Sequence, residues 1–139
     1  MIDPRGQRFS AAITTVVLAV VLLTGWVWLL GLQAVVFAIG AFVGPAQTPY
    51  GWLFKRFVRP RLAAPEHLEH ARPPRFAQLV GLVFALIGLV ALVAGATTLG
   101  LVAVALATAA AFLNAAFGFC LGCEIYLLGR RMLPAPSAD

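Results

Sequence analysis

The chain carries no charged residue between Phe76 and Cys123, where it reads FAQLVGLVFALIGLVALVAGATTLGLVAVALATAAAFLNAAFGFCLGC. A second uncharged stretch runs from Phe9 to Phe54. Each stretch is roughly twice as long as the ~20 apolar residues that one membrane-spanning helix needs. A backbone inside lipid must satisfy its own hydrogen bonds, which an α-helix does within one segment. The two stretches therefore predict two helical hairpins in a membrane.

The overall composition also indicates a membrane protein. Hydrophobic residues make up 62% of the 139 residues and charged residues 11%. Soluble domains average about 45–50% apolar and about 25% charged residues, so a soluble core of this size cannot hide so much apolar surface. Arg5 and Arg8 ahead of an apolar run also resemble a secretory signal peptide. We expect no cleavage, because the run continues far beyond a signal core of ~7–15 residues without a small-x-small site.

We expect an all-α, polytopic fold, namely a four-transmembrane-helix bundle of two helical hairpins. The expected spans cover about residues 10–29, 32–50, 76–95 and 101–123, with a polar loop at 55–75. Prolines at 45 and 49 interrupt the second span, so we expect it to end as an interfacial segment with Tyr50, Trp52 and Phe54 at headgroup depth. The last apolar stretch exceeds a ~30 Å hydrocarbon core if it is wholly helical. We therefore expect a break near Gly118 or Gly122.

The distribution of positive charge predicts the orientation of the bundle. All ten Lys and Arg residues lie before the first span, in the 55–75 loop or after the last span. The short turns expected near 30–33 and 96–100 carry none. Because positively charged segments stay in the cytoplasm during insertion, we expect the N-terminus, the loop and the C-terminus there. An even number of spans agrees with this placement.

Small residues are dense in the expected spans. Gly40 with Gly44, and Gly118 with Gly122, form small-xxx-small pairs, whose spacing lets helix backbones approach closely. Such pairs suit packing inside one bundle. A homodimer formed through one of these faces is the alternative.

Both cysteines of the chain lie in the segment Phe119–Glu124, which reads FCLGCE. Residues three apart on a helix share a face, so Cys120 and Cys123 can reach disulfide distance. The C-x-x-C spacing is typical of thiol–disulfide exchange, in which one thiolate attacks and its partner resolves the mixed disulfide. We expect Cys120 to attack, because it lies nearer the predicted helix break, where a helix start favours the thiolate. Burial in lipid would favour the neutral thiol instead.

Other polar residues leave alternatives open. Glu124 either takes a proton from a cysteine, pairs with a nearby arginine, or reaches headgroup water. His67 and His70 with the two cysteines would form a Cys₂His₂ zinc set, but we expect no metal and no cofactor. The basic loop lacks interleaved aromatic residues. We therefore expect it to contact anionic lipid headgroups of the bilayer rather than nucleic acid.

Three separated motifs mark the chain. They are Asp3-Pro4-Arg5-Gly6 with Arg8-Phe9, Pro73-Pro74-Arg75-Phe76-Ala77-Gln78, and Cys120-Leu121-Gly122-Cys123. With Gly44-Pro45 and Pro49-Tyr50-Gly51, they resemble the small bacterial membrane proteins of domain of unknown function 4395 over nearly the whole chain. The resemblance implies a multi-pass protein of the bacterial plasma (inner) membrane. It also implies thiol or sulfur chemistry at Cys120 and Cys123, beside a thioredoxin-like or sulfurtransferase partner.

Arg8 and Arg75 open the first and third expected spans, so we expect both at the cytoplasmic face together with the cysteines. There they either bind a thiolate or an anionic sulfur species, or anchor helix ends. The leading prediction is a membrane thiol–disulfide or sulfur-relay protein, an oxidoreductase if it is an enzyme, with Cys120, Cys123 and Glu124 as its catalytic residues.

Two other functions stay open. In a non-enzymatic subunit or scaffold, the cysteines would pack or staple the last helix. A transporter of a small sulfur compound would need a polar pathway. The polar residues available for such a pathway are sparse, namely Gln33, Gln47, Thr97, Thr98 and Asn114.

Overall fold

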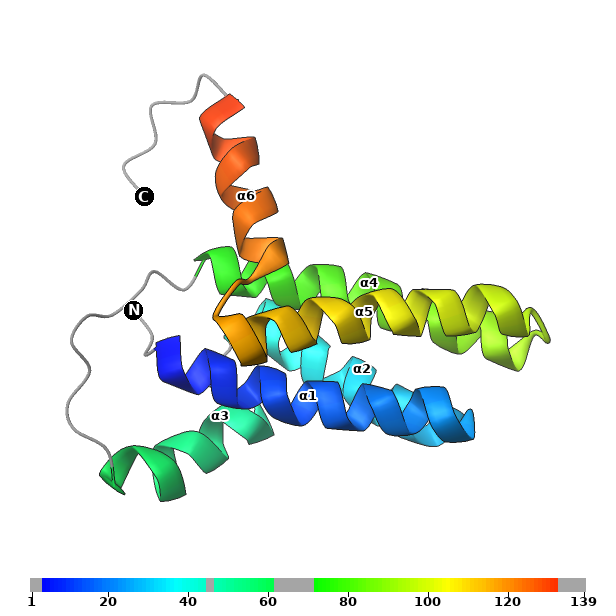
Figure 1. The fold of residues 1–139 in the computed structure, drawn as a ribbon, viewed down its shortest axis with the longest axis horizontal. Helices are drawn as coiled ribbons and strands as arrows, with labels where there is room; N and C mark the ends of the chain where they lie inside the picture. Colours follow the sequence, from blue (N-terminus) through cyan, green and yellow to red (C-terminus); the bar gives the residue numbers. More distant parts are fainter. Residues whose placement is uncertain (1–3, 45–46, 62–71, 133–139) are drawn as a thin grey trace.

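The computed structural model describes residues 4–44, 47–61 and 72–132, and these are almost wholly helical, with no strand among them (Figure 1). The elements in chain order are α1 (Pro4–Thr24), α2 (Val27–Phe42), α3 (Pro49–Leu53), the π-helical segment η2 (Phe54–Val58), the 3-10 segment η3 (Arg59–Arg61), α4 (Arg72–Val93), α5 (Thr97–Phe117) and α6 (Leu121–Met132). The prediction of an all-α fold is confirmed. His67 and His70, the histidines of the possible zinc set, lie outside the described residues.

Glycines end the first helix of each hairpin. Gly25 has a φ of 69° and donates its N–H to Val21 at 2.7 Å, which closes α1. Gly95 has a φ of 90° and follows α4 in the same way. Only glycine adopts this left-handed conformation without steric cost. The first turn therefore lies at 25–26, earlier than the turn expected near 30–33, and residues 27–42 continue as a helix.

The four long helices pack as two antiparallel hairpins (Figure 1). Helix α1 lies along α5, α2 lies along α4, and α4 also packs against its own hairpin partner α5. The core between them contains Leu18, Leu30, Phe37 and Val104, which are all at most 7% exposed. The outside is also apolar. A solvent of lipid accounts for this outer surface, because a soluble protein rarely exposes such continuous apolar area.

Three of the helices are long and apolar enough to cross a membrane, namely α1, α4 and α5. Helix α2 has 16 residues and is shorter than the expected second span at 32–50. It ends at Phe42, and Gly44 follows with a φ of 146°. A 16-residue helix extends about 24 Å, slightly less than a ~30 Å hydrocarbon core.

Helix α5 ends at Phe117, so the expected fourth span at 101–123 is interrupted. Gly118 adopts a left-handed conformation with a φ of 68°, and its N–H donates to Asn114 at 2.9 Å. This is a glycine helix stop, and it confirms the break predicted near Gly118. Helix α6 then leaves the bundle at a steep angle and packs against α4 (Figure 1).

The two halves of the chain repeat one structural unit, in which a hairpin is followed by a break and a short helix. Helix α3 follows α2 and packs on α1, while α6 follows α5 and packs on α4. The aromatic contacts correspond. Phe9 packs on Phe54 with ring centroids 5.8 Å apart, and Phe76 packs on Tyr126 at 5.6 Å. Phe54 is thus buried against α1. The interfacial segment expected from the sequence would instead place it at the surface with Trp52.

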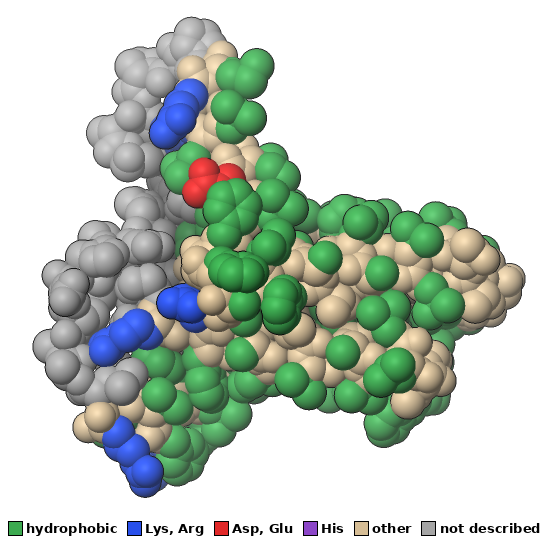
Figure 2. All heavy atoms as spheres, viewed as in Figure 1, with side chains coloured by type: hydrophobic (Ala, Val, Ile, Leu, Met, Phe, Trp, Pro, Cys, Tyr) green, Lys and Arg blue, Asp and Glu red, His purple; other side chains and the backbone are tan. Residues whose placement is uncertain are grey.

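The charged side chains gather at one end of the bundle. Figure 2 shows Lys and Arg over the end from which α3 and α6 extend, with one acidic patch, Glu124, at the base of α6. The turns at 25–26 and 94–96 lie at the opposite end, where the described residues carry no charge. Trp26 and Trp28 are exposed at that opposite end, and Trp52 and Phe57 near the charged end. Aromatic residues at both ends are typical of a bundle that meets two membrane interfaces.

Candidate functional site

Cys120 and Cys123 form a disulfide at the start of α6, with their Cα atoms 5.1 Å apart. The N–H of Glu124 donates to the carbonyl of Cys120 at 3.0 Å, which is the first hydrogen bond of α6. Cys120 is therefore the N-cap residue. Its Sγ accepts the N–H of Cys123 at 3.2 Å, as the oxygen of a serine or threonine N-cap would. The sulfur thus lies at the positive end of the helix dipole.

Two contacts fix this helix start against the bundle. Gln7 of α1 donates its Nε2 to Cys123 Sγ at 3.4 Å. Gly122 lies so close to α4 that a Cβ there would stand 2.7 Å from the Cα of Ala77. The small residue at 122 therefore allows the cysteine pair to sit directly on α4. Gly122 thus packs helices within one chain. Packing inside one bundle and dimer formation were the two alternatives for the Gly118–Gly122 pair.

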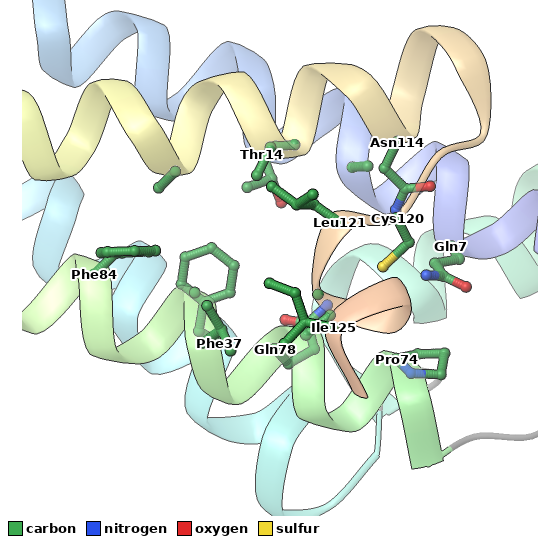
Figure 3. Close-up of a pocket in the computed structure, with 18 of the residues that line it drawn as sticks. Gln7, Thr14, Phe37, Pro74, Gln78, Phe84, Asn114, Cys120, Leu121 and Ile125 are labelled. Atoms are coloured by element: carbon green, nitrogen blue, oxygen red, sulfur yellow. The ribbon is translucent and has the colours of Figure 1, made fainter. Parts of the chain in front are cut away.

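A cavity of about 320 Å³ extends from the cysteine pair into the bundle (Figure 3). All four long helices and the first turn of α6 contribute to its wall. Its polar lining groups are Gln7, Thr14, Gln78, Asn114 and Cys120, and the remaining lining residues are apolar. Figure 3 shows the amides of Gln7 and Asn114 at the same end of the cavity as the Cys120 sulfur. In the part of the chain that the structure describes, no charged residue lines it.

Arg8 and Arg75 each donate to the last carbonyls of a neighbouring helix. Arg8 Nη2 lies 3.2 Å from the carbonyl oxygens of Ala115 and Ala116, at the end of α5. Arg75 contacts the end of α2, where its Nη2 lies 3.0 Å from the carbonyl oxygen of Phe42. A guanidinium at a helix C-terminus is stabilised by the unpaired carbonyls and by the dipole. These bonds match the second role expected for both arginines, the anchoring of helix ends.

Arg8 also passes close to the segment that leads to the cysteines. Its Cδ would stand 3.7 Å from a Cβ at Gly118, two residues before Cys120. The guanidinium of Arg8 therefore lies beside Gly118, and the hydrogen bonds described for it go to the end of α5. Glu124 is exposed in the first turn of α6, where a carboxylate interacts favourably with the helix dipole.

The first half of the chain has a threonine where the second half has Cys120. Thr48 is the N-cap of α3, and its Oγ1 accepts the N–H of Gly51 at 3.0 Å. The residue pairs Thr48/Gly51 and Cys120/Cys123 have the same spacing and the same bond from N3 to the cap side chain. The repeat thus has an ordinary oxygen cap in one half and a sulfur pair in the other.

Sequence reasoning singled out Asn114 among the amides that line the cavity, and it assigned no site role to Gln7 or Gln78. Gln7 lies in the motif around Arg8, and Gln78 lies in the corresponding motif around Arg75. The signal that could have found them is an amide within two residues of the Arg-Phe pair that opens each apolar stretch, since Gln7 directly precedes Arg8 and Gln78 lies two residues after Phe76. Gln33, which also stood out as polar, is fully buried and accepts the Tyr50 hydroxyl at 2.7 Å.

A family model described as Domain of unknown function (DUF4395) matches residues 2–131 of the chain. No curated protein and no solved structure matches it in the corresponding comparisons.

Proposed function

The chain belongs to the DUF4395 family, and from that premise we propose that it is an integral membrane protein that exchanges thiols and disulfides through Cys120 and Cys123. Cys120 is the attacking thiol and Cys123 the resolving thiol. The partner is a thioredoxin-like protein, or a sulfurtransferase that passes sulfur to the same pair. The substrate side of the reaction is the membrane face that carries the Lys and Arg residues.

The observation that carries this proposal is the sulfur of Cys120 at the N-cap of α6. In the reduced protein, the N–H of Cys123 and the helix dipole stabilise a negative charge on that sulfur. The thiolate attacks one sulfur of a partner disulfide, and the partner's other sulfur leaves as a thiolate. Cys123 then attacks the Cys120 sulfur, which forms the disulfide present here and releases the partner as a dithiol.

The repeat supports a chemical role for the pair over a packing role. Thr48 caps the equivalent helix with oxygen, so this architecture does not require sulfur at the position of Cys120. Threonine is among the favoured N-cap residues, whereas cysteine is a weak hydrogen-bonding group. Two cysteines at this position therefore point to a function that threonine cannot supply.

The proposed topology has four spans, with α2 as the second. Helix α2 returns from the turn at 25–26 to the charged end of the bundle, and it lies along α4 for its length. Tilt of the bundle and local bilayer thinning offset a mismatch of a few ångström. The excess of Lys and Arg at one end supports a cytoplasmic location for that end. On this proposal α3 and α6 lie at the cytoplasmic interface of a bacterial plasma membrane.

Trapping of a mixed disulfide tests the proposed function. The full chain is reconstituted in nanodiscs as Cys123→Ser and, separately, as Cys120→Ser, and each is incubated with an oxidised thioredoxin-type protein. We expect Cys123→Ser to accumulate a covalent complex through Cys120, because the resolving thiol is absent. Cys120→Ser should accumulate far less. Equal trapping by both variants contradicts the assigned order. No trapping by either, with both chains folded, favours the scaffold alternative.

A further inference from the structure

The cavity beside the cysteine pair accepts a neutral ligand. Among the described residues, its lining contains no Lys, Arg, Asp or Glu, and it lies between helices that are apolar on the outside. An ionised ligand buried there without a partner charge would carry a large desolvation cost. The volume of about 320 Å³ is that of a small-molecule site. A sulfur anion or a charged cofactor is therefore a poor fit for this space.

Hydrogen-bond donors and aromatic rings define the shape of the ligand. The amides of Gln7, Gln78 and Asn114 line the cavity, and amide N–H groups donate to carbonyl oxygens. Phe37 and Phe84 line it as well, and Figure 3 shows both rings at the end of the cavity away from Cys120. Aromatic faces favour a planar, conjugated ligand. The lining thus suits a flat, neutral molecule that carries carbonyl groups.

The rim of the cavity reaches the apolar outer surface. Leu106, Leu121 and Ile125 line the cavity, and they are also 54%, 40% and 50% exposed. Leu106 belongs to α5, and the other two belong to the first turns of α6. A ligand dissolved in the bilayer can therefore reach the cavity beside α6. An apolar tail on the ligand would remain against these side chains.

We propose that this cavity binds the head group of a lipid-soluble quinone, which is the electron acceptor of the Cys120–Cys123 dithiol. This inference rests on the proposed function, with the exchange run in reverse. A partner dithiol reduces the Cys120–Cys123 disulfide and leaves as a disulfide, and the quinone then oxidises the dithiol that this exchange forms. The Cys120 side chain lies in the cavity wall at the same end as the Gln7 and Asn114 amides, so a head group that accepts hydrogen bonds from these amides lies beside the reactive sulfur. A quinone combines the required properties, because it is neutral, planar, soluble in lipid, and able to accept two electrons.

The reaction balances without a further reagent. The Cys120 thiolate adds to a ring carbon of the quinone, and the S–C bond forms as the ring gains an electron pair. The Cys123 thiolate then attacks the Cys120 sulfur. The S–S bond forms, the S–C bond breaks, and the electron pair stays on the ring. The two thiol protons go to the two ring oxygens, so a dithiol and a quinone become a disulfide and a hydroquinone.

A single-turnover assay tests this inference. The reduced full chain in nanodiscs is mixed with a benzoquinone that carries a short alkyl tail. Hydroquinone is followed by ultraviolet absorbance and free thiols by chemical titration. We expect one hydroquinone per two thiols lost. The same preparation is tested separately for exchange with an oxidised thioredoxin-type protein, which measures the proposed function alone.

Three variants on α5 locate the reaction. Ala111 lines the cavity, whereas Ala109 is exposed on the outside of the same helix. Ala111→Phe fills the cavity, and we expect it to slow quinone reduction by roughly tenfold or more, since a small displacement of reacting groups has effects of that size. Ala109→Phe should stay close to the unmodified rate. Asn114→Leu removes one donor at similar volume and should raise the quinone concentration needed for half-maximal rate.

Each outcome decides the inference. The cavity is supported as the quinone site if Ala111→Phe and Asn114→Leu slow quinone reduction and Ala109→Phe does not. Equal rates in all four chains overturn it, because the reaction then takes place elsewhere. Thioredoxin exchange without quinone reduction also overturns it, and leaves the proposed function intact. Loss of both reactions in the unmodified chain overturns both.

Discussion

Gly122 controls how closely the cysteine pair approaches the bundle, and its replacement by alanine should detach α6. A Cβ at Gly122 would stand 2.7 Å from both the Cα and the Cβ of Ala77, whereas ordinary contacts lie at 3.4–4 Å. The obstacle includes α4 backbone, which no side-chain rotation can move. The two helices must therefore separate by about 1 Å at this point, which opens the contact between α4 and α6.

The expected cost of Gly122→Ala follows from this overlap. Overpacking of this kind costs about 1–3 kcal/mol, while the higher helix propensity of alanine returns about 0.5–1 kcal/mol. We expect amide hydrogen exchange in α6, followed by mass spectrometry in nanodiscs, to accelerate by up to roughly 60-fold through easier local opening. Exchange in α1 and α5 should change little. The Gln7 contact to Cys123 Sγ should weaken with the same change.

Gly129→Ala is the matched control. Gly129 lies on the same helix as Gly122, and a Cβ at Gly129 would meet nothing within 4 Å. It should slow exchange in α6 slightly through helix propensity alone. If Gly122→Ala and Gly129→Ala give the same exchange rates, then α6 does not dock on α4 through Gly122. The geometry assigned to the cysteine pair would then be wrong.

Three further predictions concern the framework around the site. Arg75→Gln should lower the free energy of unfolding by about 1.5–3 kcal/mol in denaturant titrations, because a charged group no longer donates to the carbonyls at the end of α2. Arg75→Lys should lower the free energy of unfolding by less. Tyr50→Phe should lower the free energy of unfolding by about 1–3 kcal/mol, because it leaves the side-chain oxygen of fully buried Gln33 unpaired. Adding Gln33→Leu should restore most of that stability, as measured by thermal unfolding. Thr48→Val should cost about 0.5–2 kcal/mol through loss of the bond from the Gly51 N–H, and a stability unchanged by this substitution contradicts the capping role.

The hairpins and the break in the last apolar stretch were predictable because they depend on local signals. Uncharged length indicates spans, and Gly118 next to apolar residues marks a helix stop. The turn at Gly25 was missed because aromatic and apolar residues on both sides of it read as one continuous span. Charge placement predicted that Arg8 and Arg75 lie at one end of the bundle. It left open whether they contact sulfur or carbonyl groups.

The cavity was not predictable from the sequence, because no single segment contains it. It exists where Ala107, Ala110 and Ala111 of α5 face α4 without filling the space between the helices. Such a void depends on the register of four helices at once, and the hydrophobic pattern of one helix does not specify that register. The correspondence of Thr48 with Cys120 likewise becomes visible only when both short helices are placed on their hairpins.

The most direct test of the central claim is the labelling of Cys120 by a membrane-impermeant maleimide between about pH 5 and pH 9, after mild reduction, in inside-out vesicles. A Cys123→Ser chain isolates the signal of Cys120. The account predicts fast labelling from the cytoplasmic face, with half-maximal rate clearly below the ~8.5 of an ordinary thiol. Labelling only after denaturation, or only from the opposite face, would contradict a reactive cysteine pair at the charged end of the bundle.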